Sequence, residues 1–310
     1  MQRDLKKEPL KGIIPPMATL LLDDDHLDKE GTGQLIEHLI AGGVHGIFIL
    51  GTTGECTNIS YKLRRELITL SCKLVNGRVP VLVGITDTSL EESLALSHLS
   101  KEAGATAVVA APPYYYGLGE SELITYFNKL ADNLTLPLYL YNMPSHTKTM
   151  MTQKAVLELS NHPNVYGLKD SSGQAVFFNA MIYAFRNRPD FTLLVGPEEM
   201  MAATVLMGGH GGVSGGANVF PKLFVDLYHA ADKGDLKEVG RLQEMAMELA
   251  DEIYAMGSYG SSFLKGLKAS MFILGIGTGY LASPLSAFEK EEIEVIRKKL
   301  IGLAAYKQYV

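Results

Sequence analysis

The sequence predicts an α/β protein, a (β/α)8 TIM barrel with a C-terminal helical extension, and three observations support this fold class. Short apolar runs alternate with longer segments of helical period, eight times within residues 1–235. The runs are apolar on successive residues, as in Val44–Leu50, which is typical of parallel strands covered on both faces. The length of the alternating region is usual for such a barrel. An open doubly wound sheet is the alternative that the alternation leaves.

The apolar runs define the predicted strands and the periodic segments define the helices between them. The strands are Gly12–Thr19, Val44–Leu50, Val79–Val83, Ala107–Ala110, Leu136–Tyr141, Val165–Lys169, Thr192–Val195 and Gly212–Ser214. Two helices show a one-face apolar stripe, formed by Leu63, Leu67, Leu70 and Leu74, and by Leu123, Ile124, Phe127 and Leu130. Ser89-Leu-Glu-Glu92 predicts a capping box at the start of another helix.

Residues 236–310 contain no further strand-like run. Leu236–Met256 and Phe288–Tyr306 have helical patterns, whereas Ser258–Ser262 and Gly275–Gly279 predict breaks. We therefore expect two parts, a barrel over 1–235 and a helical region over 236–310 that packs on it.

Composition restricts the class of protein. Hydrophobic residues make up 47% of the 310 residues, enough for a large core, and the net charge of −6 offers no basic surface to nucleic acid. No run of 18 apolar residues exists and the N-terminus lacks an apolar signal core, so neither a membrane span nor export is expected. Cys56 and Cys72 fit free thiols in a reducing compartment. We expect a cytoplasmic protein.

The sixth predicted strand, Val165–Lys169, ends in a lysine. In this fold, functional groups lie at the C-terminal ends of the strands. A lysine in an apolar site loses hydration of its ammonium form, so its pKa falls and the neutral amine can condense with a ketone to an iminium. The alternative is a lysine that reaches solvent at a strand end.

Three other strand ends carry polar groups. Gly51–Glu55 places two hydroxyls between glycines, where backbone N–H groups can meet a carboxylate. Tyr141 ends the fifth strand, and its phenol can relay protons. Tyr114–Tyr116 puts three phenols in one loop, as an interface patch or as functional groups. An ordinary turn and a packed rim aromatic are the alternatives for the first two.

Two further segments invite a ligand assignment that their spacing does not support. Asp23–His26 is a run of adjacent residues that cannot all face one ion, so a solvated acidic turn is expected and no metal site. Gly208–Gly212 lies where barrels often bind phosphate, but it lacks a neighbouring Walker-type lysine or hydroxyl. A close approach of backbones is expected there.

The order of four motifs is more specific than any one of them. Gly51–Glu55, Pro113–Tyr115, Tyr141–Pro144 and Gly167–Asp170 together resemble the dihydrodipicolinate synthase / N-acetylneuraminate lyase family. The resemblance runs from residue 12 to about residue 221 and continues weakly to the C-terminus. It implies a class I aldolase barrel with a helical C-terminal region and neither a metal nor an organic cofactor.

The resemblance also implies catalytic roles. Lys169 matches the Schiff-base lysine, Tyr141 the tyrosine that relays protons, and Thr53 the hydroxyl of that relay. Tyr115 matches a tyrosine that synthases lend to a neighbouring subunit, which implies a homo-oligomer, a tetramer built from dimers.

The remaining matches concern the substrate, a small 2-oxo acid. Thr52 and Thr53 match the turn that holds its carboxylate, and Gly196 and Val213 match positions whose backbones line the pocket. Ser171 stands where sugar-acid lyases often carry a hydroxyl for the distal chain.

One position departs from the synthase pattern. Synthases carry an arginine two residues after the proline of the tyrosine motif, where this chain has His146. A guanidinium grips a carboxylate through two parallel hydrogen bonds, and an imidazole does not. Gly12–Pro16 and Leu27–Gly31 also look more like the branch that acts on 2-keto-3-deoxy sugar acids.

The leading expectation is therefore a class I aldolase or dehydratase acting on pyruvate and a 2-keto-3-deoxy sugar acid, with His146 binding the substrate's distal part. The first alternative is dihydrodipicolinate synthase, which condenses pyruvate with aspartate semialdehyde. The second is a non-catalytic sensor that binds a keto acid on the same barrel.

Overall fold

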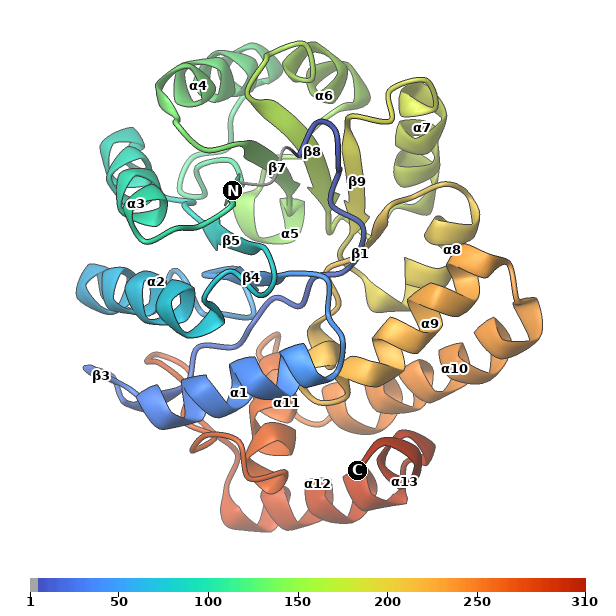
Figure 1. The fold of residues 1–310 in the computed structure, drawn as a ribbon. Helices are drawn as coiled ribbons and strands as arrows, with labels where there is room; N and C mark the ends of the chain where they lie inside the picture. The colour runs from blue at the N-terminus through green and yellow to red at the C-terminus, as the bar shows by residue number, and fades with distance from the viewer. Residues whose placement is uncertain (1–4) are drawn as a thin grey trace.

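Eight parallel strands form one sheet in the computed structural model, which describes residues 5–310. In sheet order they are β1 (Gly12–Ile13), β10 (Gly211–Gly212), β9 (Thr192–Val195), β8 (Val165–Asp170), β7 (Leu138–Asn142), β6 (Ala107–Ala110), β5 (Val81–Gly84) and β4 (Ile47–Ile49). A parallel bridge between Pro16 and Phe48 connects the segment after β1 to β4. The sheet therefore closes into a barrel (Figure 1), which confirms the predicted fold class and excludes the open sheet.

Helices surround the barrel strands (Figure 1). They are α1 (Lys29–Ala41), α2 (Tyr61–Val75), α3 (Leu90–Glu102), α4 (Glu120–Asn133), α6 (Gln153–Leu159), α7 (Ala175–Phe185), α8 (Met201–Leu206) and α9 (Pro221–Lys233). Short elements interrupt this pattern: the antiparallel pair β2 (Leu21–Asp23) and β3 (His26–Leu27), the single turn α5 (Pro144–Thr147), and the 3-10 turns η1 (Glu198–Met200) and η2 (Gly215–Asn218).

The seam of the barrel differs most from the prediction. β1 covers Gly12–Ile13 rather than Gly12–Thr19, because two prolines without backbone N–H groups follow it. β10 covers Gly211–Gly212 rather than Gly212–Ser214. A Cβ atom on Gly211 would lie 2.0 Å from the carbonyl oxygen of Gly12. The close backbone approach predicted for Gly208–Gly212 is thus confirmed, and glycine is what allows β1 and β10 to pair.

Local capping and apolar spacing explain the helices. The predicted stripes are confirmed, since Leu63, Leu67, Leu123, Phe127 and Leu130 are buried. In each case the buried side chains recur on the face that contacts the barrel.

The cap of α3 is confirmed but its capping box is wrong. Ser89 Oγ accepts the N–H of Glu92, as expected. The N–H of Ser89, however, donates to Asp87 Oδ1 at 3.0 Å, not to Glu92. The buried Asp87 lies only two residues upstream and therefore takes this donor first.

The C-terminal region lies along one side of the barrel, next to α9 (Figure 1). It consists of α10 (Leu236–Leu249), the π-helical turn η3 (Ala250–Tyr254), α11 (Ser262–Ile273), α12 (Lys290–Gly302) and α13 (Ala304–Tyr309). The segment predicted as one helix over Phe288–Tyr306 is two, because Leu303 is extended (φ −60°, ψ 145°). α11 fills the interval between the two predicted breaks.

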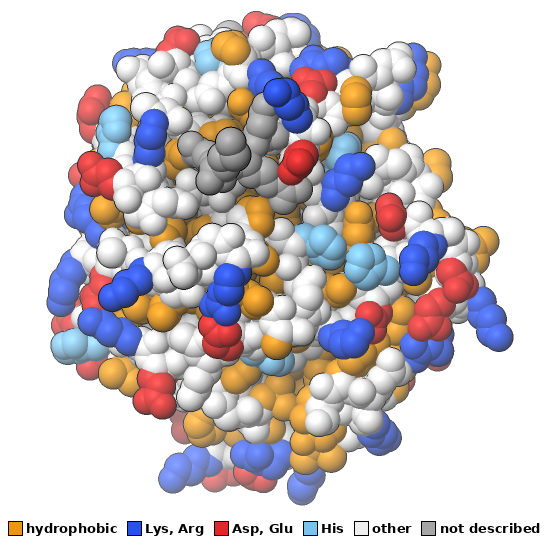
Figure 2. Space-filling view, viewed as in Figure 1, with side chains coloured by type: hydrophobic (Ala, Val, Ile, Leu, Met, Phe, Trp, Pro, Cys, Tyr) orange, Lys and Arg blue, Asp and Glu red, His pale blue; other side chains and the backbone are white. Residues whose placement is uncertain are grey.

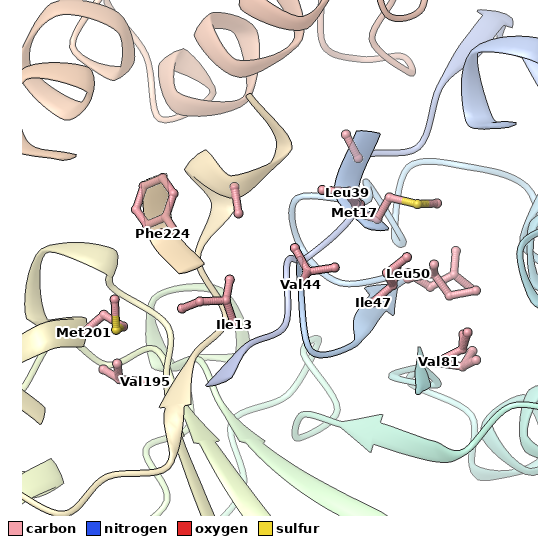
Figure 3. Packing of buried hydrophobic residues seen from close by; sticks show 14 of the residues in the cluster. Ile13, Met17, Leu39, Val44, Ile47, Leu50, Val81, Val195, Met201 and Phe224 are labelled. Atoms are coloured by element: carbon pink, nitrogen blue, oxygen red, sulfur yellow. The ribbon is translucent and has the colours of Figure 1, made fainter. Parts of the chain in front are cut away.

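Two apolar layers hold the barrel together. The larger layer lies between strands and helices, and Figure 3 shows part of it, where Ile13, Val195, Met201 and Phe224 meet. The smaller layer fills the barrel interior with Leu10, Ile14, Phe48, Leu82, Val109, Tyr139 and Leu194. Because the interior is packed, a ligand can enter only at the barrel mouth.

The surface in Figure 2 carries acidic and basic side chains interspersed, without a large patch of either sign. The predicted acidic turn at Asp23–His26 forms the tip of the β2–β3 pair, with its polar side chains exposed. Among residues 5–310, no helix is long and apolar enough to cross a membrane.

Candidate active site

A pocket of about 680 Å³ occupies the mouth of the barrel. Residues at or just after the C-terminal ends of seven strands line it, namely Leu50, Thr52, Thr53, Thr86, Ala111, Tyr141, Met143, Lys169, Ser171, Gly196 and Val213. The C-terminal region adds one wall, which includes Tyr254, Phe263 and Leu264. Eight of the nine predicted site residues line this pocket, and Tyr115 does not.

Lys169 lies near the end of β8 and is 5% exposed. The parallel register pairs it with Tyr141 of β7. Lys169 Nζ lies 3.8 Å from the centre of the Tyr141 ring and 5.0 Å from that of Phe48. The amine thus sits among aromatic faces at the pocket wall, where a bound ketone is within reach.

Thr52, rather than Thr53, partners Tyr141. Thr52 Oγ1 lies 3.0 Å from the Tyr141 hydroxyl, in a hydrogen bond that either group can donate. The structure thus places the Thr52 hydroxyl beside Tyr141, and a relay role for Thr53 stays a prediction. Thr53 is buried and lines the pocket, whereas the Thr52 hydroxyl is the one hydrogen-bonded to Tyr141 of β7.

The turn that carries both threonines has a defined conformation. Leu50 and Glu55, at its two ends, have left-handed φ values of 57° and 53°. The N–H of Glu55 donates to the Thr52 carbonyl at 3.0 Å, and Thr19 Oγ1 donates to the Gly54 carbonyl at 2.6 Å. These bonds fix the hydroxyls of the turn relative to the strands.

A buried polar link joins the ends of β7 and β8. Asn142 Nδ2 donates to Asp170 Oδ1 at 2.7 Å, and Asn142 Oδ1 accepts the N–H of Met151 at 3.0 Å. Burial raises the pKa of Asp170, although hydrogen bonds from Asn142 and Ser172 oppose the shift. Sequence reasoning missed this pair. The signal was a polar residue directly after each of Tyr141 and Lys169.

His146 and Ser171 line the outer part of the pocket. Ser145 Oγ lies 3.0 Å from His146 Nδ1. One side of the imidazole faces solvent, but partial burial, and then the positive charge of Lys169, lower the pKa of His146. A Cβ atom on Gly196 would lie 2.0 Å from Ser171 Oγ. Position 196 therefore has to be glycine for the Ser171 hydroxyl to keep its place.

Glu198 is a pocket residue that sequence reasoning missed. It follows Gly196-Pro197 after β9 and is 4% exposed. Its carboxylate accepts the N–H of Gly216 and the hydroxyl of Tyr254, both at 2.7 Å. Burial raises the pKa of Glu198 to about 7, and burial beside this carboxylate raises the pKa of Tyr254 well above its usual value. A strand-end glutamate was the available signal.

The three loop tyrosines point to different places. Tyr114 lines the main pocket. Tyr115 is 69% exposed, and its ring lies 5.0 Å from that of Tyr116, which is 75% exposed. Both line a second, smaller pocket of about 300 Å³ on the outside of the barrel. Tyr115 therefore faces away from the pocket of its own chain.

The pocket at the barrel mouth can support carbonyl chemistry through a lysine amine. Lys169 offers an amine at the pocket wall, the Tyr141–Thr52 pair offers exchangeable protons beside it, and hydroxyls and backbone groups surround the remaining space. Within residues 5–310, no group of three or more His, Cys, Asp or Glu side chains is arranged to hold a metal ion. The fold and the site define a Schiff-base-forming barrel lyase.

Comparison with known proteins agrees with this class. The model of the dihydrodipicolinate synthetase family matches residues 9–301, and the chain belongs to this family. A structure of dihydrodipicolinate synthase from Bacteroides thetaiotaomicron is 53% identical, with a TM-score of 0.93, and covers 95% of this chain and 99% of that one.

Relatives with two different substrate assignments are similar to the chain. The 4-hydroxy-tetrahydrodipicolinate synthase of Methanoculleus marisnigri is 34% identical over 94% of this chain and 99% of its own length. A putative 2-dehydro-3-deoxy-D-gluconate aldolase of Escherichia coli, YagE, is 33% identical over 93% of this chain and 96% of its own length. The crystal structure of YagE in complex with pyruvate has a TM-score of 0.89 and covers 95% of this chain and 98% of that one.

Proposed function

We propose that the enzyme joins pyruvate to an aldehyde, or reverses that reaction, through an iminium on Lys169. The observation that supports this most directly is the position of Lys169 Nζ at the pocket wall, beside the Tyr141 ring and the Tyr141–Thr52 hydrogen bond. Pyruvate bound to the YagE relative supports the choice of keto acid.

The lone pair of the neutral Lys169 amine attacks C2 of pyruvate, and the carbonyl oxygen takes up two protons and leaves as water. The resulting iminium withdraws electrons, so C3 loses a proton and an enamine forms. C3 of this enamine then attacks the aldehyde carbon, and the aldehyde oxygen takes up a proton. Tyr141 carries these protons and Thr52 accepts or returns them. Water then releases the product from Lys169.

The turn over Gly51–Glu55 is the proposed site for the pyruvate carboxylate, with Thr52 and Thr53 presenting hydroxyl and backbone groups to it. Gly196 and Val213 would line the opposite side with their backbones. Both glycines of the turn are closely packed: a Cβ atom on Gly51 would meet the Phe48 ring at 2.7 Å, and one on Gly54 would lie 3.1 Å from the Met17 carbonyl oxygen.

For the acceptor we propose aspartate semialdehyde, which would make the enzyme a 4-hydroxy-tetrahydrodipicolinate synthase. This reverses the order expected from sequence. The support is the 53% identity to the Bacteroides thetaiotaomicron synthase over 95% of the chain, set against 33% identity to the sugar-acid aldolase YagE.

The second candidate is a 2-keto-3-deoxy sugar-acid aldolase, and one observation favours it. Among the described residues that line the pocket, Lys169 is the only lysine or arginine. The lowered pKa of His146 leaves its imidazole neutral near pH 7. An anionic acceptor would then be held by neutral donors, whereas a hydroxyl-rich tail would meet Ser171, His146 and Glu198.

We further propose that the active assembly is a homo-tetramer in which Tyr115 serves a neighbouring subunit. Its 69% exposure and its orientation away from its own pocket support this role. Aromatic side chains exposed together, as with Tyr115 and Tyr116, are enriched at subunit interfaces.

The test combines covalent trapping with turnover. Borohydride treatment in pyruvate should add one reduced pyruvate to Lys169 by intact mass and peptide mapping, and Lys169→Ala should take up none. Rates with pyruvate plus aspartate semialdehyde should exceed rates of 2-keto-3-deoxygluconate cleavage. Faster sugar-acid cleavage would favour the second candidate. Trapping without turnover of either acceptor class would indicate a sensor, and an adduct on another lysine would refute the mechanism.

A further inference from the structure

The turn at the pocket is tied to the C-terminal region by a buried ion pair. Lys268 of α11 donates from Nζ to Glu55 Oε1, and also to the Tyr280 carbonyl at 2.7 Å. Glu55 Oε2 accepts the N–H of Ala282 at 2.8 Å. The side chains of Lys268 and Glu55 are 1% and 0% exposed. Every hydrogen bond of the Glu55 carboxylate is thus made to the segment from 268 to 282.

This pair is placed where it sets the conformation of the turn. Glu55 has a left-handed φ of 53°, which a non-glycine residue keeps only when its surroundings hold it there. Its N–H closes the turn on the Thr52 carbonyl at 3.0 Å. Thr52 Oγ1 in turn lies 3.0 Å from the Tyr141 hydroxyl. The chain of contacts therefore runs from Lys268 through Glu55 to the proton-relay pair.

A buried ion pair is a poor choice if the only requirement is stability. Taking both charges out of water costs more than well-packed apolar side chains of similar size would. The ion pair also fixes the orientation of the Glu55 carboxylate, because hydrogen bonds are directional and apolar contacts are not.

We propose that Glu55 and Lys268 are positioning residues for pyruvate, which hold the turn over residues 51–55 in the conformation that binds its carboxylate. The inference rests on the proposed function of that turn. Glu55 lines the pocket, but the charged atoms of both side chains are buried and engaged with each other and with backbone groups of Tyr280 and Ala282, so they are not available to bind the substrate directly. Their effect reaches the reaction through Thr52 and Thr53.

The test measures pyruvate affinity separately from fold stability. Glu55→Gln keeps the size of the side chain and removes its charge. Glu55→Gln/Lys268→Met also removes the unpaired buried ammonium, so we expect this variant to fold even where the single variant does not. Leu300→Ala is the control, because Leu300 is fully buried and belongs to α12, which packs against α11, η3 and α13. The readouts are Tm and the pyruvate concentration that gives half-maximal borohydride trapping of Lys169.

We expect both Glu55 variants to need on the order of 10-fold more pyruvate for half-maximal trapping, because a small displacement of binding groups is costly. Maximal trapping at saturating pyruvate should remain. Leu300→Ala should lower Tm and leave the half-maximal concentration unchanged. Wild-type half-saturation in the variants, or the same rise in the Leu300→Ala control, would overturn the positioning role. Loss of folding in both variants would also overturn it, by making the pair purely structural. Absence of trapping in the wild type would instead refute the proposed function.

Discussion

Asn142 and Asp170 join the two strands that carry the reactive groups, with Asn142 Nδ2 donating to Asp170 Oδ1 at 2.7 Å and neither residue exposed. Each follows directly after Tyr141 or Lys169 in sequence. The link therefore holds the ends of β7 and β8 together at the point where the amine and the phenol must stay adjacent.

Removal of the acceptor should show how much this link contributes. Asp170→Ala leaves the buried Asn142 amide without its partner, which costs about 1–3 kcal/mol of unfolding free energy. Asp170→Asn should lose less, because an amide oxygen can still accept the hydrogen bond. Urea unfolding of both variants measures the difference. Equal losses in the two variants would show that the hydrogen bond is not what stabilises this edge.

The two threonines of the turn should have different kinetic effects. Thr52→Val keeps the shape and removes the hydroxyl that bonds Tyr141, so kcat should fall by about 100-fold, as for loss of a proton-transfer group. Thr53→Val should change KM for pyruvate more than kcat. Steady-state kinetics of the matched pair decide the assignment. A larger kcat loss in Thr53→Val would restore Thr53 as the relay hydroxyl.

A cation at position 146 should favour an anionic acceptor. His146→Arg replaces an imidazole of lowered pKa by a guanidinium that can bind a carboxylate through two hydrogen bonds. A gain of about 2 kcal/mol corresponds to about a 30-fold rise in kcat/KM for aspartate semialdehyde. His98→Arg is the control, because His98 of α3 is exposed and does not line the pocket. No gain in His146→Arg would mean that other groups already hold the carboxylate.

Glu198 should make stability depend on pH. Its pKa rises from 4.5 unfolded to about 7 folded, so its stabilising contribution is complete below pH 4.5 and is lost as pH rises through 7. Glu198→Gln cannot ionise and should lack this loss, which is on the order of 3 kcal/mol at about 1.4 kcal/mol per pKa unit. Tm should therefore fall less in the variant between pH 4.5 and 8.

Glu102→Gln, in α3, is the control for this experiment. Glu102 is exposed and is not among the groups that shift the pKa of Glu198, so this variant should follow the wild-type curve at every pH. If Glu198→Gln shows the same dependence of Tm on pH as the wild type, the carboxyl of Glu198 titrates at an ordinary pH in the folded protein.

Tyr115→Phe tests the shared site. We expect a fall in kcat with the oligomer intact, because the ring remains and only the hydroxyl is lost. Sedimentation checks the assembly and steady-state kinetics the rate. Tyr116→Phe, on the equally exposed neighbour, should have little effect. A fully active monomer would refute a role for Tyr115 in a second subunit.

Features that depend on neighbouring residues in the chain were predictable from sequence, and features that depend on distant ones were not. The strands and the lysine at the end of β8 follow from runs of apolar residues, and the cap at Ser89 follows from its own side chain. That Thr52, and not Thr53, hydrogen-bonds Tyr141 could not be read from sequence, because side-chain direction in this turn is set by contacts outside it. Glu198 follows a strand end, but its hydrogen bond from Tyr254, 56 residues away, could not be read from sequence.

The ion pair between Glu55 and Lys268 spans 213 positions of the chain. A ribosome that has made every strand of the barrel has therefore not yet supplied the lysine that orients the turn. Nor has it supplied the wall that Tyr254 and Phe263 give to the pocket. During synthesis, the ability to capture a keto acid would be the last property to emerge, so a prematurely ended chain would be unable to sequester substrate.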